Sequence, residues 1–217
     1  GTGPFKFVSR TAQDSVVLER FDDYWGEKPS LSKVTYKIIE NADSVVMSLQ
    51  SGAVDLFAHL TATQVAQLGE GFHVEEGTMN LVQALYLNNA EAPFDDVRVR
   101  QALSYAIDRQ QILDLAFDGY GTLLGSSMYP AFSKYFDDSL TDYYSYDPEK
   151  AKELLTEAGY PNGFDMDITV PSNYQPHMDT AQVIVEQLKA VGINATIQPV
   201  TWDSWVSDTY VGRNFQS

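Results

Sequence analysis

The chain has 217 residues, of which 44% are hydrophobic and 12% aromatic, so it is long enough to bury a sizeable core and lacks the composition of a disordered protein. Its formal net charge of -16 argues against nucleic acid and anionic membrane surfaces as partners, because their phosphates would repel it. The chain contains no cysteine, which excludes disulfide bonds, thiolate catalysis and cysteine-based zinc sites.

The first part of the chain predicts short strands separated by short helices. Apolar residues alternate at Val34, Tyr36 and Ile38, which is typical of a half-exposed strand. Thr61 stands where it can cap a helix. We therefore expect helices at 43–50 and after Thr61, and strands at 16–21, 34–39, 54–57, 72–76 and 81–87.

The stretch 92–109 predicts a loop, a helix cap and a buried helix. Pro93 disfavours helix in the residue before it, and Asp95 or Asp96 can accept hydrogen bonds from the free amides of a helix start. Asp108 and Gln111 then match a capping box, so a second helix is expected to meet the first at a bend. One apolar face of the first helix is formed by Val99, Leu103, Ala106 and Ile107.

The last part of the chain predicts a helix followed by a strand, a helix and a second strand. Asp147 and Pro148 form a strong helix start, and Gly159 is suited to end that helix. The unit that follows covers 164–200, with a helix at 179–191, and its two strands should be parallel. These alternating elements indicate an α/β fold.

The loop 171–179 is the best candidate for a binding site that the residues alone provide. In open α/β sheets, ligands bind beyond the carboxyl ends of the strands, where this loop lies. Ser172 and Asn173 can bind amides, Tyr174 offers a flat ring with a polar tip, and Asp179 can hold a cation or an amine. An ordinary polar loop, with Asp179 or Ser172 as a helix cap, fits the same residues equally well.

The sequence lacks the patterns typical of enzymes and metal sites. His59, His73 and His177 have no metal-ligand spacing, although His177 lies in the loop just described. The chain contains no Walker sequence, serine elbow or zinc-binding helix pair. We therefore expect no catalytic residues, no cofactor and no metal site.

Four segments, at 1–29, 43–56, 93–108 and 146–159, together resemble the extracellular solute-binding proteins of ABC transporters. The resemblance is to family 5, whose members bind peptides, nickel chelates and related solutes. It implies truncated lobes of the periplasmic-binding-protein fold, type II and cluster C, with mixed sheets flanked by helices. Because family members are much longer, with a signal peptide and further chain on both sides, we expect this chain to be a piece of such a protein.

The resemblance also implies how the chain is divided and what it does. Residues 1–87 would form part of lobe I, which is β-rich, and residues 88–217 most of lobe III. Two lobes would close on a short peptide and deliver it to the permease subunits of an importer. Such a protein is extracytoplasmic, in the periplasm or on the cell surface, and contacts the membrane only through a lipid anchor outside this chain.

The resemblance adds two candidates and leaves other functions open. Trp202 is similar to a family position near the cleft, and Asn88 lies near the crossover between lobes, where it can bind a peptide amide or serve as a turn residue. The alternatives are another solute, such as nickel, a metal chelate or an oligosaccharide, or a receptor or chaperone-like module without transport. The candidate ligand-binding residues are Asn88, Ser172, Asn173, Tyr174, His177, Asp179 and Trp202.

Overall fold

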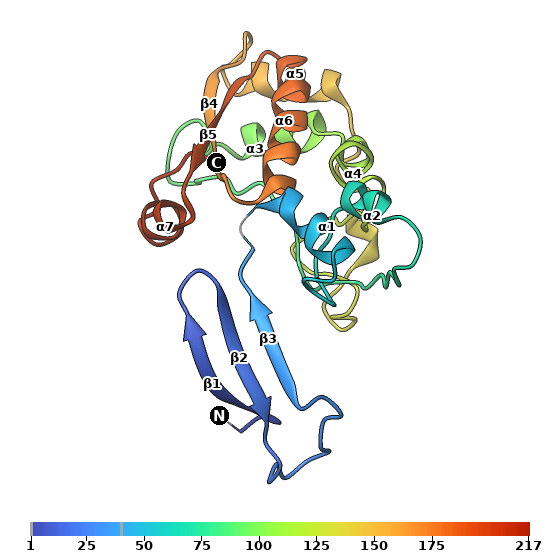
Figure 1. Ribbon diagram of the computed structural model, residues 1–217. Helices are drawn as coiled ribbons and strands as arrows, with labels where there is room; N and C mark the ends of the chain where they lie inside the picture. Colours follow the sequence, from blue (N-terminus) through green and yellow to red (C-terminus); the bar gives the residue numbers. More distant parts are fainter. Residues whose placement is uncertain (1, 40) are drawn as a thin grey trace. The chain divides into compact units, whose positions relative to one another are not determined.

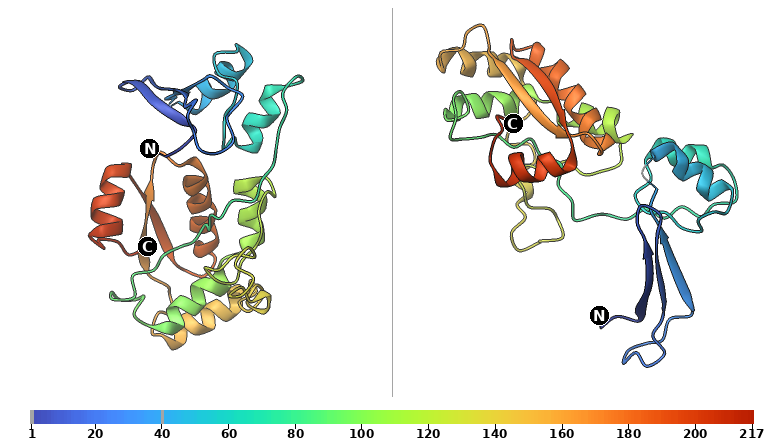
Figure 2. Two further views of the ribbon diagram at one scale, coloured as in Figure 1. Left: turned by 90° about the horizontal axis from the view of Figure 1, so that it is seen from below. Right: turned by 60° about the vertical axis from the view of Figure 1, so that its left-hand side comes forward.

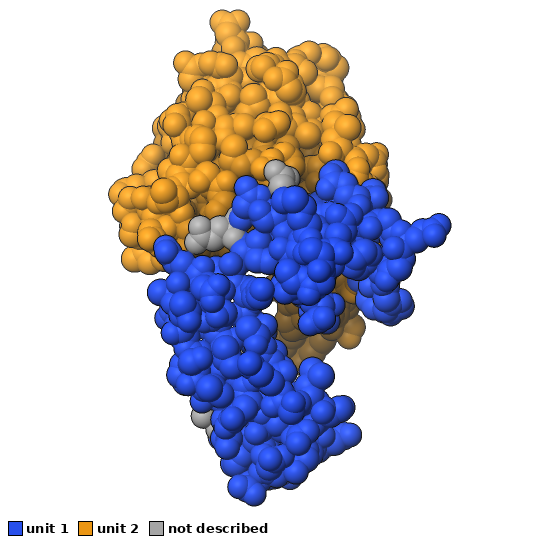
Figure 3. Space-filling view, in the orientation of Figure 1, with its two compact units in different colours: residues 1–75 blue, residues 76–217 orange. Residues whose placement is uncertain are grey.

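A computed structural model describes residues 2–39 and 41–217, which form two compact units. Unit 1 is Gly1–Glu75 and unit 2 is Glu76–Ser217 (Figure 3). This division falls earlier in the chain than the lobe boundary expected between residues 87 and 88, and the lobe assignment stays a prediction. Within the described residues, no helix combines the length and the apolar character needed to cross a bilayer.

Unit 1 contains an antiparallel sheet and two short helices (Figure 1). The sheet has the order β1-β2-β3, with β1 Phe5–Thr11, β2 Ser15–Arg20 and β3 Lys33–Lys37. The helices are α1 Ala42–Gln50 and α2 Ala62–Leu68. Asn41 caps α1, and Thr61 caps α2 through a capping box with Gln64. The two helices and the strands expected at 16–21 and 34–39 are thus confirmed, whereas β1 is an element that the sequence did not predict.

The strands expected at 54–57, 72–76 and 81–87 are wrong, because none of these segments forms a strand in the structure. Their apolar residues suggested burial, yet the side chain of Leu56 is 81% exposed and that of Leu81 is 66% exposed. A strand requires a neighbour that accepts and donates backbone hydrogen bonds, and these segments have no such partner in the described chain.

Unit 2 consists of helices around the parallel strand pair β4-β5 (Figure 1). Its helices and strands, in chain order, are α3 Val97–Ala106, α4 Arg109–Phe117, the 3-10 helix Asp138–Leu140, α5 Pro148–Glu157, β4 Asp165–Pro171, α6 Gln175–Lys189, β5 Asn194–Val200, α7 Trp202–Ser204 and the π-helix Trp205–Val211. Met166 lies opposite Ala195 in a parallel register, as the strand, helix and strand pattern predicts. Figure 2 shows α6 and the helical segment after β5 on different sides of the two strands.

The core of unit 2 is formed by α3, which packs on α5 and α6, and by α6, which also packs on both strands. Phe94 is fully buried and meets the ring of Phe164 edge to face, with the ring centroids 6.0 Å apart. The apolar face predicted for α3 is buried at Val99, Leu103 and Ala106. The remaining fully or almost fully buried residues of this core include Ala102, Ala151, Leu155, Leu188 and Ile193.

The bend between α3 and α4 is held by a glutamine from another helix. Asp108 caps α4 as predicted, since its side chain accepts a hydrogen bond from the Gln111 backbone N–H at 3.0 Å. The predicted capping box is wrong, because the side-chain oxygen of Gln111 instead accepts a bond from Gln187 Nε2 at 2.8 Å. Gln187, which is 7% exposed, also bonds the backbone N–H and C=O of Asp108, each at 3.1 Å. A buried amide must find partners for all its groups, and this bend supplies them.

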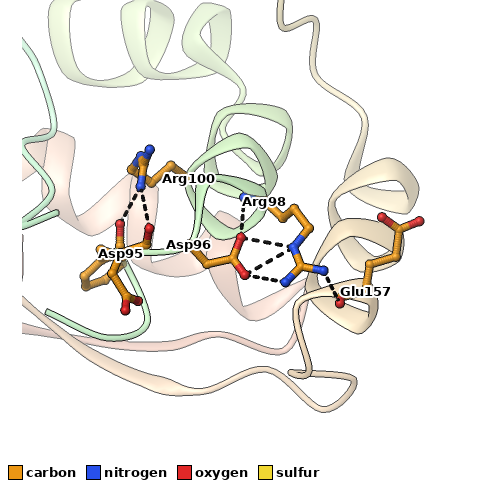
Figure 4. A network of polar contacts seen from close by, with 6 residues as sticks. Asp95, Asp96, Arg98, Arg100 and Glu157 are labelled. Atoms are coloured by element: carbon orange, nitrogen blue, oxygen red, sulfur yellow. Dashed lines mark hydrogen bonds and ion pairs between the residues drawn. The ribbon is translucent and has the colours of Figure 1, made fainter. Parts of the chain in front are cut away.

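The start of α3 is tied to the end of α5 by one arginine (Figure 4). Asp96, rather than Asp95, is the cap of α3, and its side chain accepts from the Arg98 backbone N–H at 2.8 Å. The Arg98 guanidinium lies 2.5 Å from Asp96 Oδ2 and donates to the carbonyl of Glu157 at 2.6 Å. Arg100 donates to the carbonyl of Phe94 at 2.8 Å, which fixes the loop before the helix.

We expect Phe94→Ala to lower the free energy of unfolding by about 3–5 kcal/mol, because it removes a fully buried ring and leaves a cavity. Urea unfolding followed by circular dichroism measures this change. Leu115→Ala is the control, since that side chain is 66% exposed and its loss should cost no more than about 0.5 kcal/mol. Equal losses for the two variants would contradict the assignment of Phe94 to the core.

The carboxyl group of Asp96 should have a pKa well below the ordinary value of 3.8 for an aspartate. Hydrogen bonds from the side chain and backbone of Arg98 lower its pKa from 3.8 to about 2. Because the unfolded chain takes up this proton first, the folded state should lose stability as the pH falls from 3.8 towards 2. Carbon NMR during a pH titration measures the pKa, and Arg98→Gln should raise it towards 3.8. An unchanged titration in that variant would show that Arg98 is not the cause.

Candidate functional site

The carboxyl ends of β4 and β5 bring two short loops together. The backbone N–H of Ser172, just past β4, donates to the carbonyl of Val200 at the end of β5, at 2.8 Å. Thr201 then caps α7, where its hydroxyl accepts from the Ser204 N–H at 3.3 Å. Because both strands end at the same edge, the side chains that follow them are neighbours.

Four neighbouring rings form a row at this edge, in which Tyr174 is tilted by 56° to Trp202 and the other neighbours are stacked. We call them the aromatic ladder: Tyr174, Trp202, Trp205 and Tyr210. The centroids of Tyr174 and Trp202 are 5.3 Å apart. Trp202 and Trp205 stack at 5.4 Å with only 9° between their planes, and Trp205 stacks on Tyr210 at 5.9 Å and 17°. Three of the rings are open to solvent, with Tyr174 at 41%, Trp202 at 44% and Tyr210 at 63% exposure, while Trp205 is half-buried.

The π-helix places the last ring of the ladder. Its hydrogen bonds join residues five apart, as where the Gly212 N–H donates to the carbonyl of Ser207 at 2.9 Å. This wider turn brings Tyr210 back beside Trp205, five positions earlier. π-helical turns are rare in proteins, but those that occur are often found at functional sites. The exposed ring of Tyr210 on this π-helix agrees with such a role.

His177 lies beside the ladder and is held by a distant segment. Its Nδ1 is 2.7 Å from Gln83 Oε1, and its ring centroid is 5.3 Å from that of Tyr174. Burial lowers the pKa of His177 below the usual 6.5. The imidazole is therefore neutral at pH 7, and it adds no positive charge to the site.

The other predicted residues of the loop 171–179 do not all lie in a loop. Ser172 and Asn173 are exposed in a short turn, but α6 already begins at Gln175. Asp179 is therefore inside the helix, where its carboxylate accepts from Gln175 Nε2 at 2.7 Å, and the expectation that Asp179 or Ser172 caps the helix is wrong. Pro in the first turn of a helix loses no backbone hydrogen bond, which explains the earlier start.

The hydrogen bonds of Asn88 do not involve the ladder. They join the segment before α3 to the end of the chain. Its Nδ2 donates to the carbonyl of Phe215 at 3.0 Å, and its Oδ1 accepts from the Ala90 N–H at 3.2 Å. Its backbone N–H donates to the carbonyl of Gln216 at 2.9 Å. Both ends of the side-chain amide are thus engaged within the protein, which favours its interpretation as a turn residue.

Trp205 and Tyr210 are the members of the site that sequence reasoning did not select. The spacing of Trp202 and Trp205, three residues apart after a strand, was a signal that both rings share one side of a helix. Tyr210 gave no such signal, because an α-helix would turn it away from Trp205. In the part of the chain that the structure describes, no group of three or more His, Asp or Glu side chains is arranged to hold a metal ion.

We expect the imidazole of His177 to titrate below pH 6.5, because its burial disfavours the charged form. The unfolded chain then binds this proton more readily, so folding stability should fall as the pH drops below 6.5. Proton NMR of the imidazole signals measures the pKa, with His177→Gln to assign them. Tyr174→Ala should expose the ring and raise its pKa, and a pKa at or above 6.5 in the unaltered protein would contradict this picture.

Known proteins of similar sequence identify the family of this chain. The heme-binding protein A of Haemophilus influenzae is 34% identical over 211 residues, which cover 94% of this chain and 38% of that protein. The dipeptide-binding protein of Escherichia coli is 30% identical over 220 residues, which cover 99% of this chain and 41% of that protein. The chain thus spans less than half the length of these relatives.

A solved structure of a binding protein is also similar to this chain. The binding protein AgaA of A. tumefaciens R10, in complex with agropinic acid, matches with a TM-score of 0.81 and 32% identity, covering 99% of this chain and 44% of that one. This match confirms the α/β fold of periplasmic binding proteins that the resemblance implied. The family model of the bacterial extracellular solute-binding proteins, family 5 Middle, matches residues 1–217, and its members are solute-binding proteins rather than enzymes. The chain therefore belongs to family 5 of the bacterial extracellular solute-binding proteins.

Proposed function

We propose that this chain forms one wall of a cleft that captures short peptides for an ABC importer. The aromatic ladder is the observation that carries this proposal. Soluble proteins rarely leave several stacked rings open to water unless the surface meets a ligand or a partner. The ladder also lies at the carboxyl ends of parallel strands, where α/β folds bind their ligands.

The ladder and its surroundings suit a peptide of variable sequence. Aromatic rings make apolar and stacking contacts that do not require one fixed pattern of donors. Ser172 and Asn173, exposed between β4 and α6, can bond the main-chain amides that all peptides share. A relative named for dipeptide binding, which matches 99% of this chain, supports the same choice of solute.

Capture would follow from closure of two lobes on the solute. Residues 1–87 would belong to lobe I and residues 88–217 to lobe III, with the rest of the closing lobe supplied by the remainder of the protein. A solute that contacts both lobes stabilises the closed state by as much as it prefers that state over the open one. The closed protein would then dock on permease subunits, outside the cytoplasm, with any membrane attachment through a lipid anchor.

Another solute is the second candidate, and the relatives favour it as directly as they favour peptides. One is named for heme binding and another was solved with agropinic acid. A stack of exposed rings can bind any flat or apolar group, and the neutral imidazole of His177 beside it is the form that binds metal chelates. Oligosaccharides also stack on such rings.

Native mass spectrometry of the full-length protein, purified gently from its host, tests the proposal. A heterogeneous set of short peptides released on unfolding is the expected result. Trp202→Ala should reduce the amount of bound solute, whereas Tyr135→Ala, which changes an exposed ring outside the ladder, should not. A single chelate, sugar or other small molecule would replace peptides with the second candidate, and an empty protein with a bound protein partner would contradict transport.

A further inference from the structure

The segments that supply the aromatic ladder are almost free of positive charge. Residues 172–212 contain one basic side chain, Lys189, and it pairs with Glu186 at 2.5 Å. The same residues contain three further carboxylates, those of Asp179, Asp203 and Asp208. Arg213 follows three positions after Tyr210, so residues 172–213 contain four carboxylates and two basic side chains and carry a net negative charge with His177 neutral.

Two of these carboxylates alternate with the rings along the chain. Asp203 follows Trp202 directly, and Asp208 lies in the π-helix between Trp205 and Tyr210. Both are exposed, and neither forms an ion pair within the described residues. Asp208 accepts only a hydrogen bond from the Ser207 hydroxyl, at 2.8 Å. Neither carboxylate is therefore paired with a cation among the described residues.

Among the described residues, no cation lies over a ring face of the ladder. Elsewhere the described chain does seat cations on rings, with Lys6 Nζ 5.5 Å from the centroid of Phe21 and Lys134 Nζ 5.3 Å from that of Tyr135. Tryptophan faces attract cations most strongly among the aromatic side chains, and a guanidinium can stack flat on them as an ammonium cannot. Trp205 is half-buried and stacks on both Trp202 and Tyr210, so Trp202 is the tryptophan of the ladder that is open to a ligand.

We propose that the aromatic ladder, with Asp203 and Asp208, binds the guanidinium group of an arginine side chain in the peptide solute. This inference rests on the proposed function. The planar cation would stack on the exposed face of Trp202 or Tyr174, while the carboxylates accept its N–H donors. A peptide with an acidic residue at this place would be repelled by the same carboxylates. The site would thereby add a preference for charge to a cleft that otherwise accepts many sequences.

The test uses full-length protein freed of bound solute and isothermal titration calorimetry. Ala-Arg and Ala-Arg-Ala are compared with Ala-citrulline and Ala-citrulline-Ala, because citrulline has nearly the shape of arginine without its charge. We expect the arginine peptides to bind about tenfold more tightly, as a partly desolvated cation and ring contact would give. The ratio of the two affinities is the quantity that matters, since it cancels the contacts that both peptides share.

Variants connect that ratio to the ladder. Trp202→Ala and the double variant Asp203→Asn, Asp208→Asn should each bring it close to one, while Tyr135→Ala should leave it unchanged. The double variant alters only exposed side chains, so it remains informative if Trp202→Ala does not fold. Equal binding of arginine and citrulline peptides by the unaltered protein would overturn this proposal and leave peptide capture intact. Binding of no peptide of either kind would overturn the proposed function, and this proposal with it.

Discussion

The parallel pairing of β4 with β5 is the interaction on which the candidate site depends. It aligns Pro171 with Val200, so that the chain leaves both strands at the same edge. Tyr174 precedes α6 and Trp202 begins α7, so α6 and β5 lie between them in the sequence, yet their rings are 5.3 Å apart. A shift of the register by one residue would exchange the two faces of β5 and separate these rings.

The exposed site is supported by buried and hydrogen-bonded elements around it. The side chains of α6 and both strands that face inward are buried, and Gln187 and Arg98 attach α6 and α3 to their neighbours through hydrogen bonds. This rigid base allows the ladder to keep its stacked geometry without being covered. Open rings on a fixed support lose little conformational freedom when a ligand arrives, which is the advantage of preorganised binding sites.

Local signals in the sequence predicted the elements that depend on local chemistry. Asp96, Asp108 and Thr61 cap helices where expected, and the two strands around α6 are parallel. The errors lie where distant segments decide the outcome. The segment 81–87 found no strand partner, and Gln111 bonds Gln187 instead of closing its own capping box. For the site, Tyr174 followed from the rule for strand ends and Trp202 from the family resemblance, but the π-helix that adds Tyr210 leaves no periodic pattern to detect.

The most direct measurement is a crystal structure of the full-length protein with the solute that it carries from its host. We expect the solute to lie within about 4 Å of the ring faces of Trp202 or Tyr174, at the carboxyl ends of β4 and β5. A solute bound elsewhere, with the aromatic ladder covered by the remainder of the protein, would contradict it and show that the exposed rings belong to an internal interface.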